Sequence, residues 1–96
     1  MTISRFAQAF ILFTVFTILM NMHRALILVK SKSPEDSILF NKIKVYPGVV
    51  EANMIYGPYD IYTLCQDSST MGIKKLVIDL RNLPGVVSTM TCLISE

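Results

Sequence analysis

The sequence of 96 residues has no tryptophan, one histidine and two cysteines. Cys65 and Cys92 lie far apart, with no second pair and no histidine at a metal-ligand spacing, so we expect buried, reduced thiols in a cytoplasmic protein. The four glycines stand alone and form neither a phosphate-binding loop nor a dinucleotide fingerprint. The sequence therefore predicts no metal site and no cofactor.

Charge is also scarce. Charged residues make up 17% of the chain, and the formal net charge is only +2. The lysines are scattered in pairs, which is not the basic patch of a nucleic-acid-binding surface. The acidic residues stand at expected helix starts and solvent-facing positions rather than as a pair for general acid and base catalysis. We expect neither direct nucleic-acid binding nor enzymatic activity.

Apolar residues are abundant: 52% of the chain is hydrophobic, and the mean hydropathy is +0.51. Much of the excess lies in a leader, residues 1–21, whose stretch 6–20 carries no charge. The stretch is shorter than the roughly 20 apolar residues of a membrane-spanning helix, and it is not amphipathic. Three explanations stay open: translation begins at Met20 or Met22, the leader is a short membrane anchor, or it is a helix that packs in an oligomer.

Residues 22–96 contain an internal repeat. Pro47-Gly-Val-Val recurs as Pro84-Gly-Val-Val, and each copy follows a helix-like segment and opens a β-rich one. This pattern predicts two β-α-β halves. The predicted strands are residues 24–30, 49–56, 59–65 and 86–95.

Two helices are predicted between these strands. Ser33 is expected to cap the first, in which Leu39, Ile43 and Tyr46 repeat at helical spacing. The second starts within residues 67–70, and Gly72 weakens its first turn by about 1 kcal/mol relative to alanine. The apolar face of the second helix comprises Ile73, Leu76, Val77, Leu80 and Leu83.

The order strand, helix, strand, strand, helix, strand predicts an α+β, ferredoxin-like βαββαβ sandwich. Two helices lie on one face of a four-stranded antiparallel sheet whose first and third strands are central. The first strand is aliphatic on both faces, and we assign Leu26, Leu28, Val87 and Leu93 to the face away from the helices. Because a solvent-facing sheet surface should be polar, we expect a second copy of the chain to cover it, in a dimer or larger ring.

Three motifs follow one another in the chain: Pro47-Gly-Val, Gly57-Pro-Tyr-Asp60 and Pro84-Gly-Val-Val-Ser-Thr-Met-Thr91. Together they resemble the Lrp/AsnC ligand-binding domain, also called the RAM domain, over residues 22–96. The resemblance implies sheet-mediated dimers, often assembled into octameric rings, and a small effector, typically an amino acid, bound between subunits. Full-length members carry an N-terminal DNA-reading domain, so the chain resembles a stand-alone form that modulates such full-length regulators.

The resemblance also implies a site lined by Gly57, Tyr59, Asp60, Thr89 and Thr91. Asp60 suits the ammonium group of an amino acid, and the threonine hydroxyls suit its carboxylate. Pro58 has no N–H group, which removes one donor from the loop.

We predict a cytoplasmic effector-sensing module, associated with a membrane only if residues 1–21 belong to the working protein. The alternatives are a purely structural oligomerisation module and a small ferredoxin-like dimeric enzyme.

Overall fold

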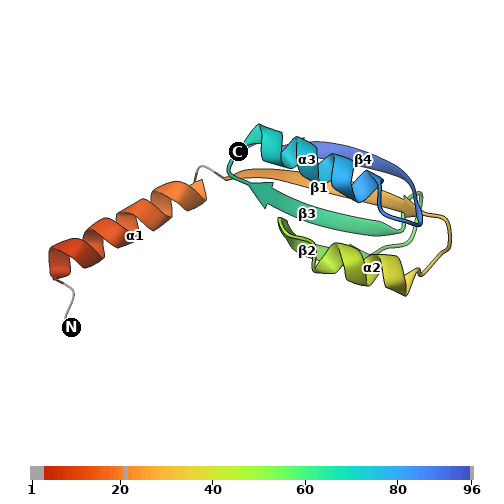
Figure 1. The fold of residues 1–96 in the computed structure, drawn as a ribbon, viewed down its shortest axis with the longest axis horizontal. Helices are drawn as coiled ribbons and strands as arrows, with labels where there is room; N and C mark the ends of the chain where they lie inside the picture. Colours follow the sequence, from red (N-terminus) through yellow and green to blue (C-terminus); the bar gives the residue numbers. More distant parts are fainter. Residues whose placement is uncertain (1–3, 21, 96) are drawn as a thin grey trace.

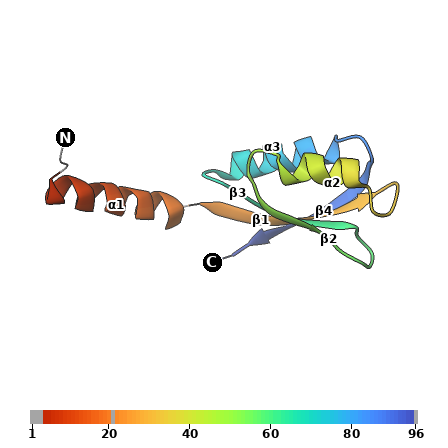
Figure 2. The same ribbon diagram turned by 90° about the horizontal axis from the view of Figure 1, so that it is seen from below.

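The computed structural model describes residues 4–20 and 22–95, which form one sheet and three helices (Figure 1). The elements are α1 (Arg5–Met20), β1 (His23–Ser31), α2 (Ser37–Lys44), β2 (Val49–Met54), β3 (Ile61–Asp67), α3 (Thr70–Arg81) and β4 (Val86–Ile94). The strands are antiparallel in the order β2-β3-β1-β4. Figure 2 shows α2 and α3 on one face of this sheet. The predicted ferredoxin-like βαββαβ fold, with the first and third strands of the domain central, is confirmed.

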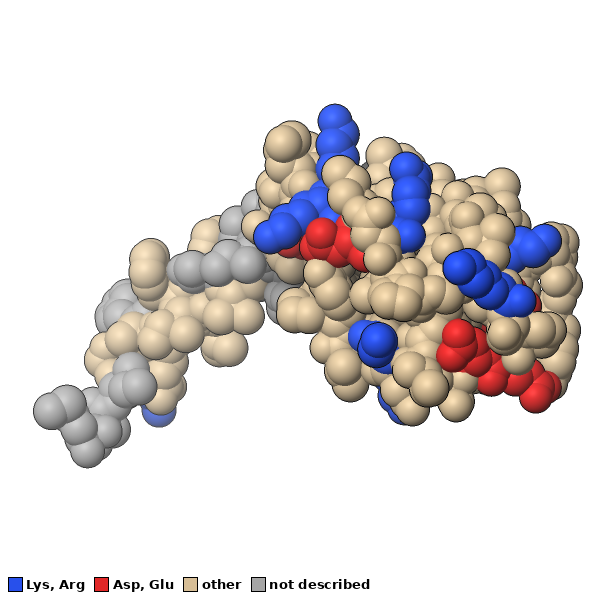
Figure 3. Space-filling model, turned by 45° about the vertical axis from the view of Figure 1, so that its right-hand side comes forward, with Lys and Arg blue, Asp and Glu red and all other residues tan. Residues whose placement is uncertain are grey.

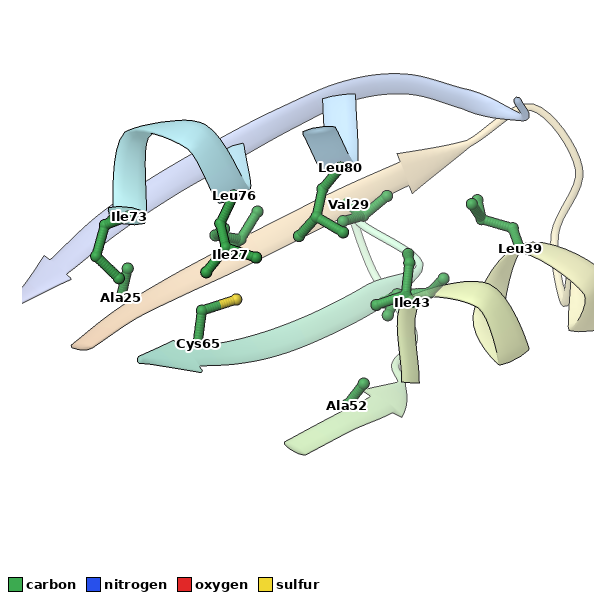
Figure 4. Packing of buried hydrophobic residues seen from close by; sticks show 11 residues of the cluster. Ala25, Ile27, Val29, Leu39, Ile43, Ala52, Cys65, Ile73, Leu76 and Leu80 are labelled. Carbon is green, nitrogen blue, oxygen red and sulfur yellow. The ribbon is translucent and has the colours of Figure 1, made fainter. Parts of the chain in front are cut away.

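The core lies between the sheet and the two helices α2 and α3 (Figure 4). Successive side chains of a strand point to opposite faces, so alternate residues of β1 and β3 meet the helices. The helical spacing predicted from Leu39 and Ile43 is confirmed, and so is the apolar face of α3. The buried apolar residues are Ala25, Ile27, Val29, Leu39, Ile43, Ala52, Ile61, Cys65, Ile73, Leu76 and Leu80.

The helix α2 begins later than predicted. Its N-cap is Asp36 and not Ser33, and the Oδ1 atom of Asp36 accepts a hydrogen bond of 3.0 Å from the N–H of Leu39. The residue before the cap, Glu35, has a φ of 58°, which lies in the left-handed region and interrupts any helix that starts upstream. The turn formed by residues 32–36 therefore stays outside the helix and lies beside the end of β1.

The repeated Pro-Gly-Val motif turns the chain from each helix into the following strand. Gly48 and Gly85 have φ values of 95° and 96°, which a residue with a side chain rarely adopts. A Cβ atom on Gly48 would also lie 2.7 Å from Cδ1 of Leu76 in the core. The internal repeat thus has a structural cause, the same left-handed turn after α2 and after α3.

The strand register corrects the prediction for the face away from the helices. Leu93 pairs with Ala25, whereas Leu26 and Leu28 pair with Cys92 and Met90. Directly paired residues lie on the same face of a sheet. Leu93 is therefore on the helix side, and its assignment to the face of Leu26 and Leu28 is wrong.

Val87 has no partner on β1, because it lies at an irregularity in the β1–β4 pairing, so its place on the face of Leu26 and Leu28 stays a prediction. Ser88 pairs with Lys30, and Val86 pairs with Ser31. This bulge breaks the simple alternation that the prediction assumed. The apolar residues that do share the uncovered face, termed the open face below, are Leu26, Leu28, Tyr62, Leu64, Met90, Cys92 and Ile94.

The first helix, α1, extends away from the sheet and its two covering helices (Figures 1 and 2). Residues 1–3 and 21 of the predicted leader lie outside the described part of the chain. Within residues 4–20 and 22–95, no helix is both long and apolar enough to cross a membrane. The explanations given for the leader stay predictions.

Gly72 lies in the first turn of α3, where the chain needs a residue without a side chain. The Oδ1 atom of Asp67 accepts a hydrogen bond of 3.0 Å from the N–H of Ser69. A Cβ atom on Gly72 would lie only 1.9 Å from that oxygen. The helix begins at Thr70 in spite of the low helix propensity of glycine, because Ser69 caps it and Asp67 packs over the glycine.

We predict that Gly72→Ala lowers the free energy of unfolding by about 1–2 kcal/mol, because overpacking against Asp67 exceeds the gain in helix propensity. In an Asp67→Ala background, where the carboxylate is absent, the same substitution should instead stabilise the protein by about 1 kcal/mol. Urea denaturation of the four proteins in this double-mutant cycle measures both values. Equal effects in the two backgrounds would contradict the close contact.

Candidate functional site

Asp60 is fixed against the end of β1. Its N–H donates a hydrogen bond of 2.9 Å to the carbonyl oxygen of Val29. Its Oδ2 atom accepts bonds of 2.8 Å from the N–H of Ser31 and 3.3 Å from the Ser31 hydroxyl. Within the described residues, no donor is bonded to the other carboxylate oxygen, Oδ1. Asp60 is thus held in one orientation with one oxygen left for a ligand.

The carboxylate of Asp60 borders a cavity of about 230 Å³, termed the acidic cavity. Ser31 at the end of β1 and Glu35 and Asp36 before α2 contribute its other polar groups. Its remaining lining residues are Pro34, Met54, Ile55, Tyr56 and Ile61. Figure 3 shows one group of acidic side chains at the end of the domain farthest from α1 and a second group nearer to α1.

The charged and apolar residues that line the acidic cavity determine which class of ligand it suits. Among the residues that the structure describes, three acidic residues line it, and no lysine, arginine or histidine does. Charge-assisted hydrogen bonds to carboxylates favour an ammonium group, while the apolar wall favours an aliphatic remainder. The cavity is therefore suited to a small cationic or zwitterionic molecule with an apolar side chain.

The structure brings only one of the predicted loop residues into this cavity. Gly57 and Tyr59 belong to the same turn as Asp60 but do not line it. Gly57 has a φ of 133°, and a Cβ atom there would meet no atom within 4 Å. In this conformation of a single chain, Gly57 shapes the turn rather than the cavity.

The two predicted threonines lie on the other side of β1. Thr89 pairs with Val29 and Thr91 pairs with Ile27, on the strand β4. Asp60 bonds to Val29 from the β3 side, so about 10 Å, two strand spacings, separates its backbone from that of Thr89. Within one chain, the structure does not join Asp60 and the threonines in a single cavity.

Several residues of this region are not among those predicted from the sequence. Arg81, at the end of α3, donates from Nε to the Oγ1 atom of Thr89 at 3.5 Å, which adds a cation to the threonine pair. Glu35 and Asp36 precede α2, where acidic residues are expected for a helix start, and they line the acidic cavity as well. Ser31 offered a signal, since it is a polar residue on the otherwise apolar, buried face of β1.

Two tyrosines outside the acidic cavity are engaged with carboxylates. Tyr46 donates a hydrogen bond of 2.6 Å to Asp79, and this bond raises the pKa of the Tyr46 hydroxyl. A hydrogen bond to Glu51 is the main cause that raises the pKa of Tyr62. Both phenols stay protonated at neutral pH, so neither is an activated base.

The two cysteines are free and lie on opposite faces of the sheet. Cys65 pairs with Ala25 on the buried face, and Cys92 pairs with Leu26 on the open face. Burial raises the pKa of Cys65 from 9.0 to about 11. Among the described residues, no cluster of three or more His, Cys, Asp or Glu side chains is placed to hold a metal ion.

Solved structures with the same arrangement of elements include TTHA0845 from Thermus thermophilus. It matches over 77% of this chain and 94% of its own, with a TM-score of 0.72 and 25% identity. AsnC from E. coli matches over 79% of this chain and 52% of its own, with a TM-score of 0.71 and 20% identity. The chain has an Lrp/AsnC-like fold. No protein-family model and no curated protein matches the sequence.

A third structure is the complex of the transcriptional regulator NMB0573 from Neisseria meningitidis with L-Met. It matches over 77% of this chain and 50% of its own, with a TM-score of 0.66 and 17% identity. The chain thus spans nearly the whole of TTHA0845 but about half the length of AsnC and of NMB0573.

We predict that the free energy of unfolding falls as the pH rises above 9.0, toward about 11, because of Cys65. The unfolded state releases the thiol proton near pH 9.0, whereas the folded state retains it, so the unfolded state binds fewer protons in this window. The slope from this group is at most about 1.4 kcal/mol per pH unit. Urea denaturation between about pH 8 and 10 measures it.

Cys65→Ala should remove this slope, while Cys92→Ala, which changes an exposed thiol, should keep it. Tyr46 and Tyr62, whose pKa values are also raised, lower the free energy of unfolding at higher pH in both variants. The difference between the two pH profiles therefore gives the contribution of Cys65 alone. Identical profiles for both variants would contradict the burial of the Cys65 thiol.

Proposed function

We propose that the chain is an effector-binding module that binds an amino acid or a related small metabolite and regulates through its own assembly. The acidic cavity carries this proposal, because it presents an oriented carboxylate of Asp60 beside an apolar wall. The complex of NMB0573 with L-Met supports it from a protein of the same fold.

The ammonium group of the effector binds the free oxygen of Asp60, with Glu35 and Asp36 adding negative potential. The side chain of the effector packs against the apolar wall that includes Met54 and Ile55. Among the described residues that line the acidic cavity, none is a cation for the effector's carboxylate. In the proposal, a neighbouring subunit supplies the missing donors, and Arg81 with Thr89 and Thr91 is the set of this chain suited to that role.

Self-association through the open face follows from its apolar residues. Met90, which pairs with Leu28, is 47% exposed, and Ile94, which pairs with Arg24 on the same face, is 40% exposed. A second sheet would remove these side chains from water, which stabilises a dimer by about 25 cal/mol for each Å² of apolar surface buried. Further association of dimers into a ring would complete the effector site between subunits.

We further propose that the domain binds rather than catalyses, that it works in the cytoplasm, and that it modulates full-length Lrp/AsnC-type regulators. Two unpaired thiols support the cytoplasmic location. Mixed assembly with a full-length regulator needs only a common open face. The second candidate function is a purely structural oligomerisation module. The apolar open face supports both functions equally, so a measurement of effector binding distinguishes them.

We predict that Asp60→Asn weakens the binding of L-methionine at least about tenfold, because it removes the charge that holds the ammonium group. The asparagine oxygen still accepts the bond from the N–H of Ser31, which preserves the local fold. Isothermal titration calorimetry measures both affinities. Asp79→Asn is the matched control, since Asp79 is bonded to Tyr46 and does not line the acidic cavity.

Equal affinities of the Asp60→Asn variant and the unchanged chain would show that the acidic cavity is not the site. If neither L-methionine nor any other of the twenty amino acids gives heat at about millimolar concentration, the effector proposal fails and the structural module stands.

We predict that Met90→Lys weakens self-association at least about tenfold, because the lysine would place a charge in the apolar interface of the open face. Leu93→Lys is the control: Leu93 is 71% exposed but lies on the helix side of the same strand. Sedimentation velocity of both variants over a range of concentrations measures the effect. Dissociation by Leu93→Lys alone would place the interface on the opposite face.

A further inference from the structure

The helix α1 presents apolar side chains in every direction. Phe10, Ile11, Leu12 and Phe13 are consecutive, so their side chains point about 100° apart and together cover the circumference. They are 71%, 50%, 70% and 69% exposed. No charged residue lies between Arg5 and His23 in the sequence.

A helix that is apolar all round needs apolar contact all round. A second protein surface, including another copy of this domain, would cover one stripe of α1 and leave the rest in water. The domain of the same chain does not cover these four side chains either, because α1 extends away from the sheet and from α2 and α3 (Figures 1 and 2). We propose that α1 embeds in the apolar layer of a lipid bilayer and tethers the domain to that surface.

The charges at the ends of α1 fit this environment. Arg5 stands at the first turn, and His23 and Arg24 follow the helix at the start of β1. His23, Arg24 and Lys74 line a hollow of about 280 Å³ at the end of the domain from which α1 emerges. The other residues of this hollow are Thr70, Ile73, Leu93, Ile94 and Ser95, none of them acidic. Asp67, which pairs with His23, is an acidic residue at the same end of the sheet. Within the hollow itself, Arg24 and Lys74 beside apolar side chains form a surface that attracts the anionic headgroups of lipids.

The length of α1 limits how it is embedded. Its 16 residues extend about 24 Å, less than the roughly 30 Å of a bilayer's hydrocarbon layer. The side chain of Arg5 is long enough to reach toward headgroups from the first turn of the helix. The proposal is therefore a helix held within the bilayer, with the folded domain at the water interface, and it does not depend on the proposed effector.

The test uses the full chain, which has no tryptophan, so that a single introduced tryptophan reports its surroundings. Leu12→Trp marks α1, and Ile38→Trp marks an exposed position of α2 in the domain. Both proteins are reconstituted from detergent into phosphatidylcholine vesicles with about one quarter phosphatidylglycerol, made with or without brominated acyl chains. We expect blue-shifted emission and at least about twofold quenching for Leu12→Trp, and neither for Ile38→Trp.

Flotation of the vesicles provides the second measurement. Leu12→Asp combined with Val15→Asp should lower the ratio of bound to free protein at least about tenfold, because both charges would enter the apolar layer. The matched control, Ile38→Asp with Ile78→Asp, changes two exposed apolar residues of the domain and should leave flotation unchanged. Lys74→Gln should reduce flotation with anionic vesicles more than with phosphatidylcholine alone.

The proposal is overturned if the Leu12→Trp emission is quenched no more than that of Ile38→Trp. It is also overturned if the paired aspartates on α1 leave flotation unchanged. Unquenched emission together with oligomers that dissociate on the same α1 substitutions would identify further copies of α1 as the occupant instead.

Discussion

The pairing of β1 with β3 on one side and β4 on the other determines where everything else in this chain lies. The odd-numbered residues of β1, Ala25 to Val29, are fully buried and receive the side chains of α2 and α3. Its even-numbered residues, Leu26 and Leu28, make the open face apolar. The end of β1 orients Asp60 through Ser31, and its start follows α1. One strand therefore links the core, the proposed interface, the acidic cavity and the tether.

Much of the fold could be predicted because it depends on local chemistry. Helical spacing identified Leu39 and Ile43, and the two Pro-Gly-Val segments marked the ends of α2 and α3 by the left-handed turn that their glycines permit. The sequence predicts that the open face is apolar, but it does not predict which residues of β4 belong to that face. Whether Leu93 or Ile94 faces the helices depends on the register with β1, which pairing energies distributed over the whole strand decide.

The candidate site could be predicted only in part, because some of its residues are placed by local sequence and others by tertiary packing. The resemblance singled out Asp60, and the structure gives this carboxylate an orientation and a cavity. Glu35 and Asp36 enter that cavity because the left-handed conformation of Glu35 delays the helix start, a consequence of the turn after β1 that no helix-start pattern contains. Arg81 reaches Thr89 only because α3 packs along β4, so its role depends on tertiary packing.

The two ends of β1 give the proposed tether and the proposed sensor compatible positions. His23 and Arg24 begin the strand beside α1, whereas Ser31 ends it beside Asp60, Glu35 and Asp36. The nine residues of β1, at about 3.3 Å each, place the acidic cavity roughly 25 Å from the tether, beyond two Debye lengths at physiological ionic strength. With α1 in lipid, as proposed, the charge of the membrane surface is screened at the acidic cavity, so the proposed tether does not change the attraction of the cavity for an ammonium group.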